Sequence, residues 1–231
     1  MCDLDIYIFL EQINIVSIDS ILIILVSAFF ISLVFSLQLV KEFIYLNAVD
    51  LIGSVLSITF LREISPVLTA IVLIGKIGSY FTAQLATMQI TEQIDALYIL
   101  NISPFNYLIL PRIFSLVIML PILNILYFIT SLFSSLFICF SVYNIDTCIF
   151  FDSVLNKIDI IDCYKSSLKA SIFGFSIAII SCACGFTAQR SSKSVGIATT
   201  LSVVISLLFI FMLDFVLSYY MFDNSDVAFA I

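Results

Sequence analysis

The sequence contains no histidine and no tryptophan, and Asp, Glu, Lys and Arg together make up only 11% of its 231 residues. Histidine is the most frequent general base and the commonest metal ligand, so its absence argues against both kinds of site. We therefore expect no metal and no cofactor. Basic residues are also scarce, with 9 Lys and Arg against 16 Asp and Glu. Nucleic-acid binding calls for clustered Lys and Arg, so a nucleic acid is not expected as a partner.

A phosphate-binding loop is missing as well. Such a loop has the pattern Gly-x4-Gly-Lys-Ser/Thr, because its backbone N–H groups must surround the phosphates. The Gly75-Lys76 pair is preceded five residues earlier by Ala70 and followed by Ile77, so it fails at both ends of the pattern. No arrangement of nucleophile and base is recognisable either. The chain is therefore not expected to be an enzyme, and any energy for its work must come from a partner.

The sequence has six cysteines but no histidine that could bind a metal together with them. Cysteine within apolar runs behaves as a small apolar residue, and we interpret Cys182 and Cys184 in this way. Cys148 and Cys163 flank one polar loop, and the sequence leaves open whether they pair.

Apolar residues, by contrast, make up 62% of the chain, and its mean hydropathy is +1.23. Runs of about 20 apolar residues match the hydrocarbon core of a bilayer. The sequence therefore predicts an all-α polytopic membrane protein that forms one domain over residues 1–231. The predicted membrane segments are 20–40, 51–86, 108–143, 166–188 and 194–220. Acidic residues precede the first run, which argues against a cleaved signal peptide.

Two stretches outside these segments are predicted to be short helices. Residues 1–18 alternate acidic and apolar side chains and place their apolar residues on one helical face, which is typical of a helix in the membrane interface. A frayed terminus is the alternative. Residues 88–100 carry too many polar side chains for hydrocarbon and are rich in helix formers. The polar stretch 144–164 is predicted to be an exposed loop that includes a short helix.

The segment 51–86 is too long for one upright span and has two interruptions. At Ser65-Pro66 the serine resembles an N-cap followed by proline at the first helical position, which predicts a break or kink. At Gly75 and Gly78 two small residues permit the close approach of another backbone.

Four ionisable residues lie within or near the predicted spans: Arg62, Glu63, Lys76 and Asp214. Charges in a span are costly, and they usually face a protein interior or a wet cavity. We interpret these residues as lining or bracing a path through the protein, with Glu63 paired with Arg62 or Lys76. For Arg62 and Lys76 the alternative is that they reach the headgroups from an interfacial position.

Several motifs resemble the MlaE/YrbE family, the permease subunits of ABC-type lipid transporters, whose plant relatives serve the plastid envelope. The matching stretches in the first half are Arg62–Ala70, Gly75–Ser79, Thr91–Leu97, Tyr107-Leu108 and Pro111-Arg112. Those in the second half are Leu168-Lys169, Phe173-Gly174, Gly185, Val195-Gly196, Ala198–Thr200 and Asp214-Phe215. The resemblance covers most of the chain, from about residue 10 to residue 217.

The resemblance implies that residues 88–100 form a coupling helix that docks on an ATP-binding subunit. The residues expected to make this contact are Thr91, Glu92, Gln93, Asp95 and Leu97. A polar amphipathic helix can bury Ile94 and Leu97 in a partner's groove while its acidic side chains make directed contacts. An ordinary solvated loop is the alternative. Gln84 stands where many family members carry glutamate, which puts in doubt any mechanism that needs an acid at this position.

The resemblance further implies a homodimer around a central path for phospholipid or a related glycerolipid, together with an MCE-domain lipid-binding partner. The bias toward Ile, Phe, Ser and Tyr suggests an AT-rich genome. With the resemblance, it favours the inner envelope membrane of a plastid, with a bacterial inner membrane as the alternative. A stand-alone secondary transporter or channel with an ion relay through Glu63, Lys76 and Asp214 is the competing class. A scaffold without transport would leave the interruptions in 51–86 unexplained.

Overall fold

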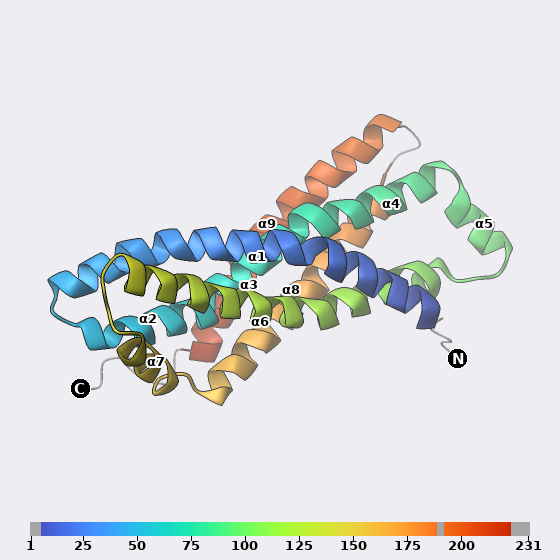
Figure 1. Cartoon of the computed structure of the whole chain (residues 1–231). Coiled ribbons are helices and arrows are strands. Elements are labelled where there is room, and N and C mark those ends of the chain that lie inside the picture. The colour runs from blue at the N-terminus through green and yellow to red at the C-terminus, as the bar shows by residue number, and fades with distance from the viewer. Residues whose placement is uncertain (1–5, 189–191, 223–231) are drawn as a thin grey trace.

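The computed structural model describes residues 6–188 and 192–222, and within these residues every regular element is a helix. Five helical segments are long and apolar enough to cross a membrane: Phe9–Tyr45, Val49–Ile90, Phe105–Ser141, Ile160–Phe186 and Lys193–Met221. They lie alongside one another in an elongated bundle (Figure 1). The predicted all-α polytopic membrane fold is confirmed.

The described residues form α-helices and short 3-10 or π turns, both in the spans and between them. In chain order these are α1 (Ile6–Tyr45), η1 (Val49–Leu51), α2 (Ile52–Thr59), η2 (Phe60–Ile64), α3 (Ser65–Leu73), η3 (Ile74–Gly78), α4 (Ser79–Ile90), α5 (Gln93–Ile99), η4 (Phe105–Ile109), α6 (Leu110–Ser141), α7 (Thr147–Leu155), α8 (Ile160–Phe186) and α9 (Ser192–Phe222). The short helix α5 lies at one end of the bundle and α7 at the other, here called the α5 end and the α7 end (Figure 1).

The first helix differs from its prediction. The sequence predicted a separate interfacial helix over 1–18, of which residues 1–5 lie outside the described residues, and a span from residue 20. Instead, α1 runs through both stretches as one helix of 40 residues. Its sequence contains no glycine or proline, so nothing in the backbone stops the helix between the two parts. A helix of this length is about 60 Å long, twice the hydrocarbon thickness, so part of it extends beyond the membrane core.

Helix α8 is the centre of the bundle. It packs on α4, α6 and α9, while α1 packs on α6 at the periphery. The outer helices expose large apolar side chains such as Leu22 of α1 and Met212 of α9, as lipid-facing surfaces do. Small and hydroxyl side chains join the helices. Thr82 of α4 donates to the Ser181 carbonyl of α8 at 3.0 Å and lies 2.9 Å from Ser202 Oγ of α9. Such contacts are typical of membrane bundles, where lipid gives apolar surfaces little reason to associate.

The predicted short helix in the polar loop is present as α7. It packs against α2, where Gly53 allows the backbone of α7 to come close. A Cβ atom on Gly53 would lie 2.6 Å from the Phe150 carbonyl oxygen. Cys148 of α7 and Cys163 of α8 are both exposed free thiols, so the pairing that the sequence left open does not occur in this structure.

Gly174 provides a test of the packing between α6 and α8. A Cβ atom there would lie 2.7 Å from the Leu116 carbonyl oxygen, which belongs to the backbone of α6 and cannot turn aside. We expect Gly174→Ala to lower the free energy of unfolding by about 1–3 kcal/mol, because overpacking forces the helices apart. Gly196→Ala is the control, because a Cβ atom there meets nothing within 4 Å. Thermal unfolding in detergent compares the two, and equal midpoints would contradict the assignment.

Candidate functional site

Lys169 of α8 is fully buried, and its ammonium group contacts carboxylates from two other helical segments, η2 and α9. Its Nζ donates to Glu63 Oε2 at 3.0 Å, to Ser218 Oγ at 2.9 Å and to the Arg62 carbonyl oxygen at 3.1 Å. Asp214 Oδ1 lies 2.6 Å from the same nitrogen, without hydrogen-bond geometry. A buried ammonium group is tolerated only where close oxygen atoms replace its hydration, and these four oxygens do so.

A second ion pair lies beside the first. Arg62 directs both Nε and Nη2 toward one oxygen, Asp162 Oδ2, at 3.2 Å and 2.7 Å. Asp162 is in the first turn of α8, so this pair ties η2 to the same helix that carries Lys169. We call the following residues the charge cluster: Arg62, Glu63, Asp162, Lys169, Asp214 and Ser218.

The charge cluster presents carboxylate to its surroundings. The side chain of Lys169 is 0% exposed, whereas those of Glu63 and Asp214 are 43% and 22% exposed. Lys169 lies nine residues into α8, about 14 Å along the helix from its α7-end terminus. Lys169 is therefore inside the span Ile160–Phe186, and Asp162 is near the end of it. Chemically, the accessible face of the cluster is a hydrogen-bond acceptor.

The proline in this segment explains one contact of the cluster. The sequence predicted a break at Ser65-Pro66 with Ser65 as N-cap, but Ser65 is helical, with φ −65° and ψ −46°, so the N-cap prediction is wrong. Instead, the helix passes through the π-turn η2, in which the Ser65 N–H donates to the Phe60 carbonyl. Pro66 has no N–H for the Arg62 carbonyl four residues earlier, and Lys169 donates to that oxygen.

The structure brings together three of the ionisable residues that the sequence singled out: Arg62, Glu63 and Asp214. The predicted partner of Glu63 is wrong, because its carboxylate contacts Lys169 and not Arg62 or Lys76. Sequence reasoning included Lys169 only in a matched motif and assigned Asp162 to a loop. A signal for Lys169 was available, since it is a cation inside an apolar run, the same criterion that selected Lys76.

The two remaining polar candidates lie elsewhere. Lys76 is half-buried on the second π-turn, η3, about 20 Å along the helix from Glu63. Gln84 of α4 is nearer the α5 end, where Arg112 Nη2 donates to its Oε1 at 2.8 Å. One protomer therefore does not gather all the predicted polar residues into a single path.

The two glycines of η3 differ in their surroundings. Gly78 is buried against α8, and a Cβ atom there would lie 3.1 Å from Ser181 Oγ. At Gly75, by contrast, an added Cβ atom would meet nothing within 4 Å. Of the two glycines of η3, Gly78 is therefore the one that serves helix packing within this chain.

The predicted coupling segment is a sharp turn around a short helix. Residues 88–90 belong to α4, and α5 spans only Gln93–Ile99. The backbone is left-handed on both sides of α5, at Glu92 (φ 59°) and Asn101 (φ 62°). Thr91, Glu92 and Gln93 are exposed, whereas Asp95 and Leu97 are half-buried.

The apolar side of this segment differs from its prediction. Ile94 is 3% exposed because it packs against its own chain, so the prediction that it enters a partner's groove is wrong. Large apolar side chains nearby are exposed instead: Tyr98, Ile99, Leu100, Ile102 and Phe105. They and the exposed polar residues 91–93 form the surface that we call the α5 face.

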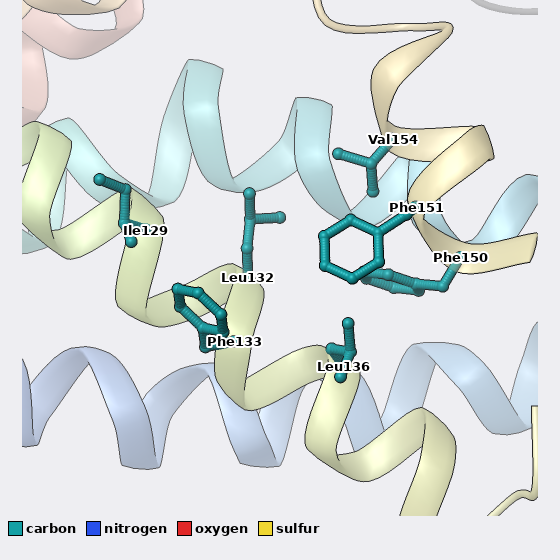
Figure 2. Close-up of a pocket in the computed structure, with 7 residues that line it drawn as sticks. All are labelled: Ile129, Leu132, Phe133, Leu136, Phe150, Phe151 and Val154. Atoms are coloured by element: carbon teal, nitrogen blue, oxygen red, sulfur yellow. The ribbon is translucent and has the colours of Figure 1, made fainter. Parts of the chain in front are cut away.

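An apolar pocket lies between α6 and α7. It has about 90 Å³ of open space and is lined by Ile129, Leu132, Phe133, Leu136, Phe150, Phe151 and Val154. In Figure 2 the rings of Phe150 and Phe151 project from α7 toward α6. A shallower apolar groove of about 320 Å³ between α1 and α6 shares Phe133 with it. No residue of the charge cluster lines either space, so the apolar and charged parts of the protein are separate.

Five apolar spans, an ion network inside them and a helical turn exposed at one end define an integral membrane protein of the transport class, because ionisable residues within spans mark pathways or their supports. Residues 9–220 match the family described as Permease MlaE, and the chain belongs to this family. The relatives that it resembles carry compatible descriptions.

The chain is 48% identical over 220 residues to a probable ABC transporter permease protein, ycf63, of Pyropia yezoensis, covering 95% of this chain and 84% of the relative. It is 44% identical to the probable ABC transporter permease protein slr1045 of Synechocystis, covering 94% and 82%. Protein TRIGALACTOSYLDIACYLGLYCEROL 1, chloroplastic, of Arabidopsis thaliana is 40% identical, covering 87% of this chain and 57% of that protein.

Proposed function

We propose that this permease moves phospholipid or a related glycerolipid along a path formed by two copies of the chain, driven by a separate ATP-hydrolysing subunit. The chain is the membrane-spanning subunit of an ABC-type lipid transporter. The observation that carries this function is the match to the MlaE permease family over residues 9–220. The apolar pocket and groove between α1, α6 and α7 offer surfaces suited to acyl chains.

The ATP-hydrolysing subunit docks on the α5 face. This surface combines exposed polar groups with large exposed apolar side chains, the composition from which protein interfaces are built. Its left-handed residues Glu92 and Asn101 fix the turn, so a partner meets a shaped surface and not a flexible loop. The absence of a phosphate-binding loop from the sequence supports a separate source of ATP hydrolysis.

The complex also contains an MCE-domain lipid-binding protein, which receives or delivers lipid at the α7 end. Gly75, with open space beside it, permits close approach of the second copy. We propose that the complex lies in the inner envelope membrane of a plastid, with a bacterial inner membrane as the alternative. The chloroplastic relative in Arabidopsis thaliana and the ycf63 relatives in Pyropia yezoensis and Porphyra purpurea support the plastid.

Purification of the tagged protein in nanodiscs tests this function. We expect an ATP-hydrolysing subunit and an MCE-domain protein to co-purify, and mass spectrometry to detect two copies of the chain and bound glycerolipid. Lipid transfer from labelled liposomes should require ATP. Purification as a lone chain that transfers lipid without ATP would exclude the proposal.

Glu92→Lys is expected to separate the permease from its ATP-hydrolysing subunit while leaving it folded. Glu92 is exposed, and lysine at the same left-handed position adds no new backbone requirement, so the effect comes from the reversed charge. If docking buries Glu92 in a charge pair, reversing its charge costs about 2–5 kcal/mol of binding free energy. Co-purification and ATP hydrolysis measure the loss. Glu42→Lys, an equally exposed change at the α7 end, is the control. Unchanged co-purification of the Glu92 variant would remove this residue from the docking contact.

A further inference from the structure

A second buried cation, Arg112, lies at the α5 end. The residue is 2% exposed, although it belongs to the first turn of α6. Its Nη2 donates to Gln84 Oε1 at 2.8 Å, and its Cζ lies 5.4 Å from the centre of the Phe81 ring. Gln84 and Phe81 are both on α4. The side chain of Arg112 thus connects α6 to α4. We call Arg112, Gln84 and Phe81 the α4–α6 clamp.

The buried guanidinium group of Arg112 carries a positive charge, and the clamp contains no negative charge to pair with it. Among the described residues no carboxylate pairs with Arg112, and its Nη1 is buried without a hydrogen-bond partner. A buried guanidinium group is normally paired, because burial removes the water that solvated it. Here the Gln84 amide, the face of the Phe81 ring and the Cys182 side chain take the place of an ion pair. Gln84 supplies the oxygen acceptor of this contact, and the Cys182 side chain of α8 is a second, weaker hydrogen-bond partner.

The clamp lies at the base of the α5 turn. Gln84 is six residues before the end of α4, and Arg112 is two residues after the start of α6, so the clamp joins the two helices that lead into and out of α5. Helix α5 itself is short and packs mainly on α4, and its residue Ile94 is buried. The position of the α5 face relative to the other spans therefore follows from how α4 and α6 are held together at this end.

We infer that Arg112 is a positioning residue for the docking of the ATP-hydrolysing subunit. By holding Gln84 and Phe81, it fixes the spacing of α4 and α6, and with it the orientation of the α5 face. This role rests on the proposed function of that face. It assigns a role to a buried cation outside the charge cluster, and it makes Gln84 the residue through which Arg112 is hydrogen-bonded to α4.

Hydrogen–deuterium exchange in nanodiscs tests the clamp without any partner. Gln84→Leu keeps the approximate size of the side chain and removes the acceptor. We expect exchange of the backbone amides in 91–104 to become faster by roughly threefold to thirtyfold, the range typical of residues that transmit coupling. Amides of α1 and of α8 near Lys169 should not change. Thr87→Ala, an exposed change three residues further along α4, is the control and should behave as wild type.

Two further variants separate positioning from general stability. Arg112→Lys keeps the charge but loses the planar fork, so it should resemble Gln84→Leu. Gln84→Glu supplies a carboxylate to Arg112, so exchange in 91–104 should be as slow as in wild type or slower, with docking preserved. Retention of the ATP-hydrolysing subunit that co-purifies with wild type should fall by a similar factor in Gln84→Leu.

Unchanged exchange in Gln84→Leu, or faster exchange spread evenly over the whole bundle, would overturn the inference. Glu92→Lys distinguishes this failure from a failure of the proposed function. If Glu92→Lys and Gln84→Leu both leave ATPase retention unchanged although Gln84→Leu loosens 91–104, docking at the α5 face is wrong while the clamp is real. If Glu92→Lys abolishes retention and Gln84→Leu changes nothing, only the inference about Arg112 is wrong.

Discussion

Lys169→Met is expected to be among the most damaging single changes in this protein. The substitution leaves the carboxylates of Glu63 and Asp214 close together without the cation that both contact, and it removes the donor to the Arg62 carbonyl. Removing one partner of a buried ion pair costs about 3–5 kcal/mol. Since total stability is typically about 5–15 kcal/mol, this is a large share of it. Thermal unfolding in detergent and the yield of inserted protein measure the effect.

A control variant and a rescue variant test whether unpaired charge explains the instability of Lys169→Met. Lys76→Met changes the same residue type on a half-buried surface of η3, and its effect should be much smaller. The triple variant Lys169→Met, Glu63→Gln, Asp214→Asn removes all three charges together. It should recover part of the lost stability, because neutral groups of similar shape tolerate burial better than an unpaired charge. If the triple variant is no more stable than Lys169→Met alone, then electrostatics do not explain the role of Lys169.

The number and approximate position of the spans could be predicted because the thickness of the membrane determines them. A run of about 20 apolar residues has few alternatives to crossing the bilayer. The end of a helix is a weaker signal. The predicted boundary near residue 19 relied on acidic side chains, but α1 contains no residue that ends a helix, so it continues. In the second span proline suggested a break, and the π-turn η2 accommodates it without one.

Which charged residues matter could be predicted in part, but their partners could not. A charge within an apolar run is visible in the sequence, and this criterion selected Arg62, Glu63 and Asp214 as well as Lys76. The identity of a partner depends on tertiary packing. Lys169 is 106 residues from Glu63 along the chain, and Asp162 is 100 residues from Arg62. No local pattern connects residues so far apart.

The α5 turn shows a similar limit. The amphipathic pattern correctly indicated that Ile94 is buried, but an apolar face does not reveal whether its partner is the same chain or another. The structure assigns Ile94 to the packing of α5 on its own chain. It leaves Tyr98, Ile99 and Leu100 exposed, which the amphipathic pattern does not predict.

Substitutions of Glu63 distinguish an ATP-driven permease from a proton-driven transporter. Its Oε2 accepts hydrogen bonds from Lys169 Nζ and from Ser218 Oγ, both at 3.0 Å. Glutamine keeps a carbonyl oxygen for these donors, so Glu63→Gln should reduce lipid transfer moderately, by about tenfold or less. Leucine offers no acceptor and weakens the compensation of the buried Lys169. Glu63→Leu should therefore lose about 3–5 kcal/mol of stability and nearly all transfer.

Lipid transfer between reconstituted liposomes, with ATP and separately with an imposed proton gradient, measures this difference. If Glu63 is a structural brace, as the contacts with Lys169 and Ser218 suggest, the Gln variant retains ATP-dependent transfer and the gradient alone drives none. If the carboxylate must take up and release a proton, Gln is as inactive as Leu, because an amide does not titrate. Transfer that is driven by the gradient without ATP, and lost equally in both variants, would replace the ATP-driven mechanism with a relay through Glu63.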